Sequence, residues 1–211
     1  MRILKLFLVF FTAYFFLTSC NSHFNPKPKG YFKIDFPKRS YKTFDEPGYP
    51  YRFEYPSYAT ISKQTDSSEH QPYWLNLGFE GFNGKIYLSY KDIQGYSVYK
   101  VKSANGYKDS IARNSFDQLR DEAFSMTYKH TIKASGIVDS FFRVRRGYAG
   151  IYFYVAGNAA TSKQFFITDS VKHFLRGALY FDATPNEDSI SVVSDFLEED
   201  VKHLIRTLKW K

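Results

Sequence analysis

The alternation of apolar and polar residues after position 57 predicts a chain built mostly of β-strands. Apolar side chains recur at every second position in several short segments, which is the pattern of strands with one buried face. Gly81–Gly84 and Gly157–Ala160 supply turn residues between strands, and Asn83-Gly84 favours the positive φ of a tight hairpin. The predicted strands are Tyr58–Lys63, Tyr73–Phe79, Lys85–Tyr90, Ile137–Val144, Tyr148–Ala156, Lys163–Asp169 and His173–Phe181. Consecutive hairpins predict an antiparallel sheet.

Two segments change to a helical period. The first is predicted to be a helix from about Lys108 to Lys129, and the second follows the stop and acidic first turn of Pro185–Asp188. Apolar residues at helical spacing are Ile111, Phe116, Leu119, Ala123, Phe124 and Met126 in the first, and Val193, Leu197, Val201, Leu204, Ile205 and Leu208 in the second. The predicted fold class is therefore α+β, an antiparallel sheet of about five to seven strands flanked by a middle helix and a C-terminal helix.

Prolines and composition divide the chain into four predicted regions. Residues 1–19 are expected to be a signal peptide, 20–30 an extended tether, 31–57 a proline- and aromatic-rich arm, and 58–211 a single α+β domain. Within the arm, the segments Tyr31–Phe36 and Tyr51–Tyr55 alternate between prolines and are expected to form either short edge strands or an extended arm.

The N-terminus predicts an exported lipoprotein. Two cations within Met1–Lys5 precede the uncharged run Leu6–Leu17, whose 12 residues fall short of the about 20 that a spanning helix needs. The run ends in Leu17-Thr18-Ser19-Cys20, the order of aliphatic, small, small and cysteine in a lipobox. We expect a signal peptidase to recognise the first three of these residues, and Cys20 to carry diacylglycerol and an N-acyl chain such as palmitate. The alternative is an ordinary cleavage site beside a chance cysteine.

The single cysteine and the charge limit what the mature chain could do. With Cys20 lipidated, no thiol remains for a disulfide, a thiolate metal site or a cysteine nucleophile. The formal net charge of +8 would fall to about +6 with the signal peptide, which suits an anionic partner, a lipid surface or solubility. We expect no nucleic-acid partner, because no helix concentrates Lys and Arg on one face.

Aromatic residues make up 20% of the chain and offer one binding hypothesis. A row of exposed rings on strands could stack on glycan, and the candidates are Trp74, Tyr87, Tyr90, Tyr96 and Tyr99. The more ordinary interpretation is that these rings alternate along strands and fill the core or form cross-strand pairs. An envelope glycan- or peptidoglycan-binding protein is therefore the alternative function.

The residues that carry metal or catalytic chemistry in other proteins form no strong pattern. His23, His70, His130, His173 and His203 lack the i, i+4 spacing of a helical zinc site, so we expect satisfied surface or cap histidines and no metal. Ser97-Val98-Tyr99-Lys100 matches Ser-x-x-Lys, but its companion motifs are missing. Glu198-Glu199-Asp200 are adjacent on the last helix and are expected to form a solvated face. The sequence thus predicts no catalytic residue and no small-molecule substrate.

Several motifs taken together resemble the gliding-motility lipoprotein GldD family. The resemblance begins at Pro26-Lys27-Pro28-Lys29-Gly30-Tyr31-Phe32 and Ile34-Asp35-Phe36-Pro37, shortly after the cysteine. It continues in Phe53-Glu54-Tyr55-Pro56, in Tyr128-Lys129-His130-Thr131 and in the terminal helix that closes on Trp210. The order of strands and helices is also similar to the PsbP and Mog1 type of α/β/α sandwich, which by itself implies no function.

The family resemblance implies a non-enzymatic component of the cell envelope, needed for gliding and for the type IX secretion that gliding depends on. The partners expected are the membrane, through the lipid anchor, and other gliding or secretion components. Because no acidic cluster follows Cys20, we expect the protein to face the periplasm. We also expect the tether to order part of a docking surface, through Lys27, Lys29, Tyr31 and Phe32.

Overall fold

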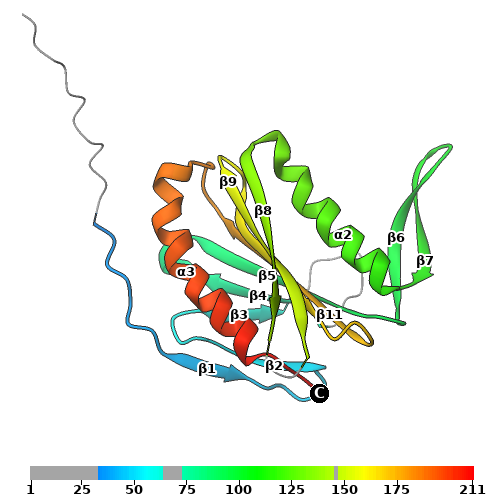
Figure 1. Cartoon of the computed structure of the whole chain (residues 1–211), viewed down its shortest axis with the longest axis horizontal. Helices are drawn as coiled ribbons and strands as arrows, with labels where there is room; N and C mark the ends of the chain where they lie inside the picture. The colour runs from blue at the N-terminus through cyan, green and yellow to red at the C-terminus, as the bar shows by residue number, and fades with distance from the viewer. Residues whose placement is uncertain (1–32, 64–72, 145–146) are drawn as a thin grey trace, which may run out of the picture. The chain divides into compact units, whose positions relative to one another are not determined.

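The computed structural model describes residues 33–63, 73–144 and 147–211 (Figure 1). The chain divides after Ile34, and the second unit, Asp35–Lys211, is compact. The second unit holds all the described helices and strands. The predicted signal peptide, the lipidation site at Cys20 and the tether residues from Lys27 to Phe32 lie outside the described residues.

A seven-stranded antiparallel sheet is the centre of the second unit. Its strand order is β3-β4-β5-β11-β10-β9-β8, with every neighbouring pair antiparallel. Its strands are β3 (Thr60–Lys63), β4 (Leu75–Phe79), β5 (Gly84–Asp92), β8 (Ala134–Arg143), β9 (Ala149–Gly157), β10 (Thr161–Thr168) and β11 (His173–Phe181). The prediction of an α+β fold with one antiparallel sheet and two flanking helices is confirmed.

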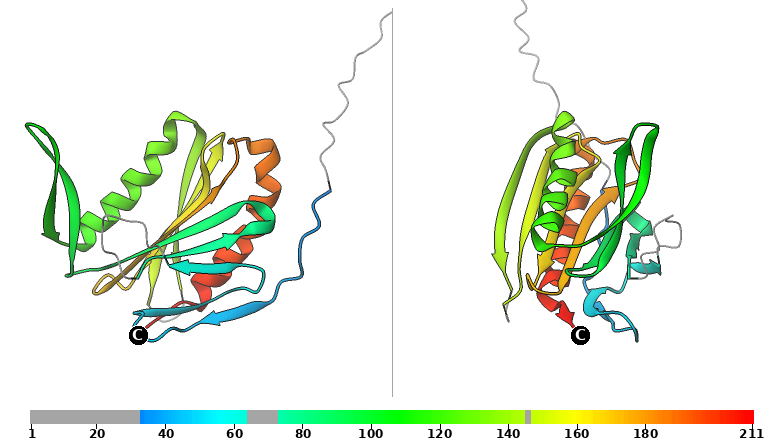
Figure 2. Two further views of the ribbon diagram at one scale, coloured as in Figure 1. Left: turned by 180° about the vertical axis from the view of Figure 1, so that it is seen from behind. Right: turned by 90° about the vertical axis from the view of Figure 1, so that its right-hand side faces the viewer.

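One face of this sheet is covered by the C-terminal helix and by a small second sheet (Figures 1 and 2). Helix α3 (Glu187–Thr207) begins at its acidic first turn and buries the predicted apolar stripe, including Leu197, Val201 and Leu204. The second sheet has the order β1-β2-β12, with strands β1 (Tyr41–Phe44), β2 (Tyr51–Pro56) and β12 (Lys209–Trp210). These elements share one apolar core with β4, β5, β10 and β11.

The segment predicted as an arm is part of this core. Tyr51 and Phe53 on β2 are among the largest fully buried side chains, so this segment forms a strand of the core and not an extended arm. The strand is not the expected edge strand, and the boundary expected after residue 57 falls inside the compact unit. Strand β2 is the middle strand of its sheet, paired on one side with β12 through Lys209 and Arg52. That partner lies at the other end of the chain, so the local pattern of prolines could not reveal it.

The other face of the large sheet is covered in part by helix α2 (Phe116–Tyr128), which continues into the 3₁₀ turn η2 (Lys129–Ile132). Leu119 and Ala123 pack against Phe153, Phe166 and Phe174 of the sheet. The helix is shorter than predicted, because the preceding strand runs to Arg113 and Ser115 caps the helix by accepting a hydrogen bond from the backbone nitrogen of Gln118 at 3.2 Å.

The prediction of helix from Lys108 was wrong. Residues there form a two-stranded hairpin, β6 (Tyr96–Ser103) and β7 (Gly106–Arg113), which turns at Gly106 with φ of 118°. Asn105-Gly106 is a hairpin signal of the same kind as Asn83-Gly84, where Asn83 takes the expected positive φ of 49° after the 3₁₀ turn η1 (Glu80–Phe82). We call residues 96–113 the projecting hairpin, because it extends away from the sheet beside one end of α2 (Figures 1 and 2).

The burial of β2 makes a testable prediction for stability. We expect Phe53→Ala to lower the free energy of unfolding by about 3–5 kcal/mol, because it leaves a cavity in the core. Chemical denaturation of the full chain measures this change. The control is Tyr107→Ala, which removes a ring that is 75% exposed and should change the stability by less than about 0.5 kcal/mol. Equal effects of the two substitutions would contradict the placement of β2 in the core.

Candidate functional site

The charged residues of α3 form two buried clusters, which correct the prediction of a solvated face at Glu198-Glu199-Asp200. Only Glu199 has the expected exposure, with 52% of its side chain accessible. Glu198 and Asp200 are both buried, and Asp200 is only 1% exposed. Their burial could not be predicted from the local sequence, because most partners of the two carboxylates lie far away along the chain.

Glu198 is held by two lysines and a tyrosine. Its carboxylate lies 2.6 Å from Nζ of Lys163 and 2.7 Å from Nζ of Lys202, and accepts a hydrogen bond from the Tyr154 hydroxyl at 2.9 Å. Burial alone would raise the pKa of Glu198, but these hydrogen bonds and charges outweigh it and hold the pKa below its ordinary value of 4.5. The arrangement fixes an ionised carboxylate against the sheet, with donors on both of its oxygens.

Asp200 connects α3 to the N-terminal strands. Its carboxylate accepts hydrogen bonds from the hydroxyls of Tyr41, at 3.0 Å, and Tyr58, and lies 3.5 Å from Nε of Arg39. Burial and the neighbouring carboxylate raise the pKa of both tyrosines, so both hydroxyls stay protonated as donors. This cluster is structural, since both oxygens of the buried carboxylate have a donor within the fold.

The three described histidines, His130, His173 and His203, do not come together in one site. His203 lies 2.7 Å from the carboxylate of Glu54 and stacks on Tyr41, with ring centroids 3.6 Å apart. His173 is buried, not at the surface as expected, and its Nδ1 is 2.7 Å from the Tyr90 hydroxyl. Burial lowers the pKa of both His130 and His173. His23 and His70 lie outside the described residues, among which no group of three or more His, Cys, Asp or Glu side chains could hold a metal ion.

The Ser-x-x-Lys match does not form a catalytic pair in the structure. Ser97 and Lys100 both lie on β6, three positions apart, where side chains point to opposite faces of the strand. Ser97 is buried, whereas Lys100 is exposed. The lysine therefore has no geometry for activating this serine.

The five candidate aromatics separate into different environments. Tyr90 is buried on the α3 face of the sheet, and Tyr96 is exposed on the projecting hairpin. The side chain of Tyr99 is outside the described part of the structure. Trp74 and Tyr87 alone are brought together, in a cleft between β5, β11 and α2. The described rings among the five therefore do not form one continuous row, because strand alternation places Tyr87 and Tyr90 on opposite faces of the sheet.

This cleft, which we call the α2 cleft, has a volume of about 180 Å³ and lies where α2 leaves the sheet uncovered. Its polar lining includes Ser89, an ion pair of 3.0 Å between Lys91 and Glu122, and Arg176. Burial lowers the pKa of the Arg176 guanidinium, which donates a hydrogen bond to the side-chain oxygen of Gln164. Rings beside charged and hydroxyl groups suit stacking and hydrogen bonding to a sugar.

A second hollow of about 760 Å³ adjoins the α2 cleft and shares Tyr87 with it. Its lining includes Lys85, Tyr180 and Asp182, and the rings of Tyr87 and Tyr180 meet edge to face with centroids 5.6 Å apart. The two hollows together form a polar and aromatic surface on the open part of the sheet.

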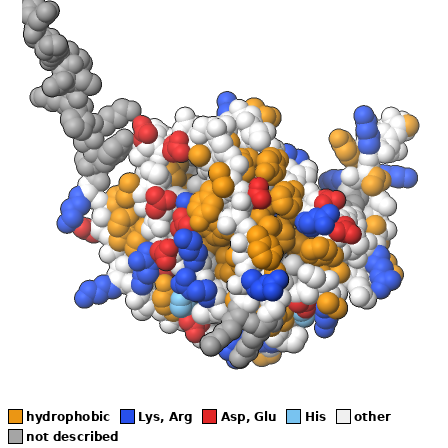
Figure 3. All heavy atoms as spheres, viewed as in Figure 1, with side chains coloured by type: hydrophobic (Ala, Val, Ile, Leu, Met, Phe, Trp, Pro, Cys, Tyr) orange, Lys and Arg blue, Asp and Glu red, His pale blue; other side chains and the backbone are white. Residues whose placement is uncertain are grey.

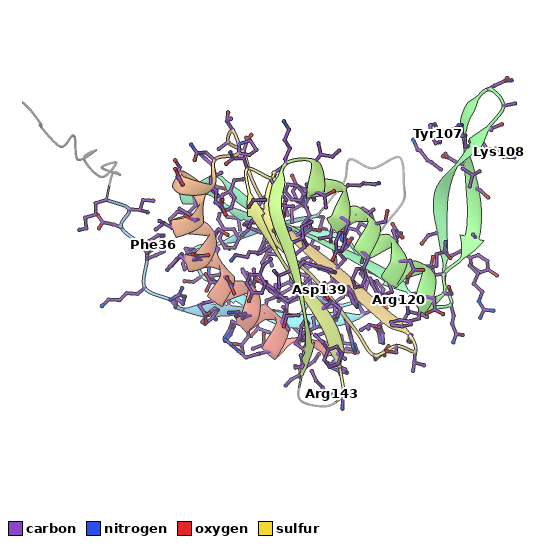
Figure 4. All side chains as sticks on the ribbon, turned by 45° about the horizontal axis from the view of Figure 1, so that its top comes forward. Phe36, Tyr107, Lys108, Arg120, Asp139 and Arg143 are labelled. Atoms are coloured by element: carbon purple, nitrogen blue, oxygen red, sulfur yellow. The ribbon has the colours of Figure 1, made fainter. Side chains whose placement is uncertain are left out.

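The projecting hairpin is the other candidate surface. Tyr96, Tyr107 and Ile111 on it are 73%, 75% and 74% exposed. Lysines and arginine outnumber acids on its two strands, with Lys100, Lys102, Lys108 and Arg113 against Asp109. Figure 4 shows Tyr107 and Lys108 near its tip, away from the core. An isolated two-stranded hairpin is marginal in water, and exposed apolar side chains on one are typical of a surface that contacts a partner.

A family model described as the gliding motility lipoprotein GldD matches residues 21–210. Among solved structures, cyanobacterial PsbP (CyanoP) from Synechocystis sp. is similar with a TM-score of 0.42 and 11% identity, covering 87% of this chain and 98% of that chain. No curated protein matches the sequence. Within the described residues, no helix has the length and apolar character to cross a membrane.

The Glu198 cluster makes a prediction for stability. We expect Glu198→Gln to destabilise the fold by about 1–3 kcal/mol, because Lys163, which is only 11% exposed, and Lys202 would lose their closest carboxylate. Denaturant unfolding at neutral pH measures the loss. Glu199→Gln, made next to it on the same helix at an exposed position, is the matched control and should change the stability by less than about 0.5 kcal/mol.

The same cluster predicts a pH dependence. The folded-state pKa of Glu198 lies below its ordinary value of 4.5, so its stabilising contribution is present above that pH and is lost as the pH falls through the folded-state pKa. The difference in unfolding free energy between the wild type and Glu198→Gln should therefore shrink as the pH is lowered from about 7 to about 3. A difference that stays constant over this range would contradict the assignment.

Proposed function

The chain belongs to the gliding motility lipoprotein GldD family, and we propose that it is a non-enzymatic accessory subunit. We propose that it acts by docking to other proteins of the gliding apparatus. The proposal includes a requirement for the type IX secretion that accompanies gliding. The observation that carries docking is the projecting hairpin, whose exposed aromatic and basic side chains extend beyond the domain (Figure 4). Ser97 and Lys100 lie on opposite faces of β6, so the Ser-x-x-Lys motif does not bring the two side chains together as a catalytic pair.

The lipid anchor would place this hairpin at a membrane surface. Family membership supports a lipoprotein of the cell envelope, and we propose from the lipobox that Cys20 is the lipidated residue. Asn21–Asn25 carry no acidic residue, and we propose a periplasm-facing orientation on this basis. An anchored domain samples a thin layer next to the membrane, where the local concentration of other membrane components is high, so modest contacts suffice for docking.

The chemistry of the hairpin suggests what the partner surface presents. Tyr and Ile side chains give apolar contact area, while the lysines favour a partner with an acidic rim. Interface energy concentrates in a few large side chains near the centre of a contact, and Tyr96, Tyr107 and Ile111 fit that role. We therefore propose these three residues as the anchors of the docking surface.

The tether supplies a second proposed contact. Lys27, Lys29, Tyr31 and Phe32 combine basic and aromatic character immediately before the compact unit that starts at Asp35. We propose that they contact the same machinery. Replacement of all four with serine should abolish gliding and secretion at normal protein level, and unchanged motility and secretion would rule the tether out as a docking element.

The α2 cleft favours one alternative function. Trp74 and Tyr87 beside Lys91, Glu122 and Arg176 provide the stacking and hydrogen-bonding groups of a sugar site, so the alternative is binding of envelope glycan or peptidoglycan. The test is saturable binding of purified envelope polysaccharide to the full chain. Binding that is lost in Tyr87→Ala and kept in Tyr107→Ala would favour this alternative, whereas no saturable binding would leave docking as the function.

A pull-down tests the docking proposal. We expect the tagged lipoprotein, recovered from detergent-solubilised envelopes and analysed by mass spectrometry, to enrich gliding or type IX secretion components over a Cys20→Ala control. A triple variant, Tyr96→Ser, Tyr107→Ser and Ile111→Ser, should reduce that recovery by more than about tenfold, because hot-spot residues each contribute at least about 1 kcal/mol.

The matched control for the hairpin is Val192→Ser. Val192 is an exposed apolar residue on α3, outside the hairpin, so its replacement tests whether loss of any surface apolar group has the same effect. We expect wild-type recovery for this control. Equal recovery with the hairpin variant and the control would contradict docking through the hairpin.

A further inference from the structure

Strand β8 is an open edge of the large sheet. In the strand order it pairs with β9 on one side, and no described element pairs with its other side. The opposite edge strand, β3, has only four residues and ends at Lys63, which are features that discourage edge pairing. Strand β8 has ten residues, and Gly136–Arg143 contains neither proline nor lysine. After the register shift between Ala134 and Gly136, these eight residues pair regularly with β9.

Strand β8 exposes one large apolar side chain on each face. Val138 is 64% exposed on the α3 side of the sheet, and Phe141 is 62% exposed on the α2 side. Figure 3 shows hydrophobic side chains gathered in the middle of the face where β8 runs between the two helices. A long edge strand with free backbone groups and apolar side chains is a template for the addition of another strand.

We propose that β8 pairs with β8 of a second copy of this chain, antiparallel and about a two-fold axis through Phe141. A two-fold axis perpendicular to the sheet places the same face of both copies on the same side. Residues opposite each other therefore share a face, and the axis passes between the two copies of one residue. With Phe141 at the axis, Asp139 faces Arg143 of the second copy and Val138 faces Val144. The result is one sheet that runs through both copies.

Charge selects this register. Asp139 and Arg143 are the only charged residues of β8, and Figure 4 shows the first midway along the strand and the second at its end. An axis at Asp139 would oppose two carboxylates, and an axis at Ser140 would place Asp139 opposite Phe141. Only the axis at Phe141 pairs each carboxylate with a guanidinium, and it does so twice by symmetry.

Both charged groups are available for this pairing. The described residues include no ion partner for Arg143 within the molecule. Asp139 accepts one hydrogen bond, from the Tyr128 hydroxyl at 3.2 Å through one of its two oxygens. A carboxylate offers about four lone-pair positions, so it can accept from the arginine as well.

The α3 side of the edge also leaves room for a second strand. A cleft of about 520 Å³ separates β8 from α3, with Ser140 and Phe142 on the strand side and Ile205 on the helix side. In the proposed register Ser140 faces Phe142 of the second copy, so an aromatic ring of the neighbour is placed beside this cleft. The lipid anchor expected of this family would confine both copies to one membrane and so favour their encounter.

Cysteine cross-linking of the full chain in its own membrane tests the register. Opposite residues in an antiparallel pair have Cα atoms about 4.5–5.5 Å apart, within the range of a disulfide. Residue 141 is opposite itself, so we expect Phe141→Cys to give a disulfide-linked dimer on mild oxidation. Val138→Cys is the matched control, equally exposed but opposite residue 144, and should stay monomeric. Both positions are on the surface, so folding is maintained.

Charge exchange then tests the pairing of Asp139 with Arg143. In the Phe141→Cys chain, Asp139→Arg or Arg143→Asp should each reduce the cross-linked fraction by at least about tenfold, because two like-charge contacts replace two attractive ones. The double exchange should restore it. Equal cross-linking at residues 138 and 141, no cross-linking at residue 141, or a double exchange that fails to restore the dimer would each overturn the proposal.

Discussion

The buried carboxylate of Asp200 is the interaction on which the architecture of this domain depends. A carboxylate that is 1% exposed is tolerated only when its oxygens are satisfied, and here the donors are Tyr41, Tyr58 and Arg39. Those three residues precede the large sheet, whereas Asp200 lies on the last helix. The start of the compact unit, from Arg39 to Tyr58, is therefore fixed to the last helix, and strand β2 can close the core with Tyr51 and Phe53.

As a consequence, the two faces of the large sheet are covered to different extents. The α3 face is sealed by the helix, the small sheet and a dense set of aromatic rings, among them Tyr51, Tyr90 and Trp210. The α2 face is covered by one helix of 13 residues, which leaves the rings and charges of the α2 cleft and the projecting hairpin accessible. Aromatic content by itself therefore does not indicate a binding surface, since most of these rings are in the core.

Local patterns in the sequence were sufficient for the elements whose partners are close in the chain. The hairpins from β8 to β11 and the amphipathic stripe of α3 are of this kind, and their predicted bounds differ from the structure by a few residues. The predictions failed where the structure depends on partners that are distant in the sequence or on a turn between strands. Ile111 fits a helical stripe by spacing, yet the turn at Gly106 pairs it with Val98 across a hairpin. Glu198 is adjacent to exposed Glu199, and only the fold shows that Lys163 of β10 meets it.

The three accessible features are arranged so that they can be used together. The α2 cleft is built on β5 and β11, and β8 is separated from β11 by β10 and β9 in the strand order. The projecting hairpin leaves the sheet after β5, at the cleft side of that order. Pairing through β8 would thus extend the sheet at one edge without occupying either surface. Two copies joined in this way would present two hairpins related by a two-fold axis, and a partner that repeats within an assembly would gain from engaging both.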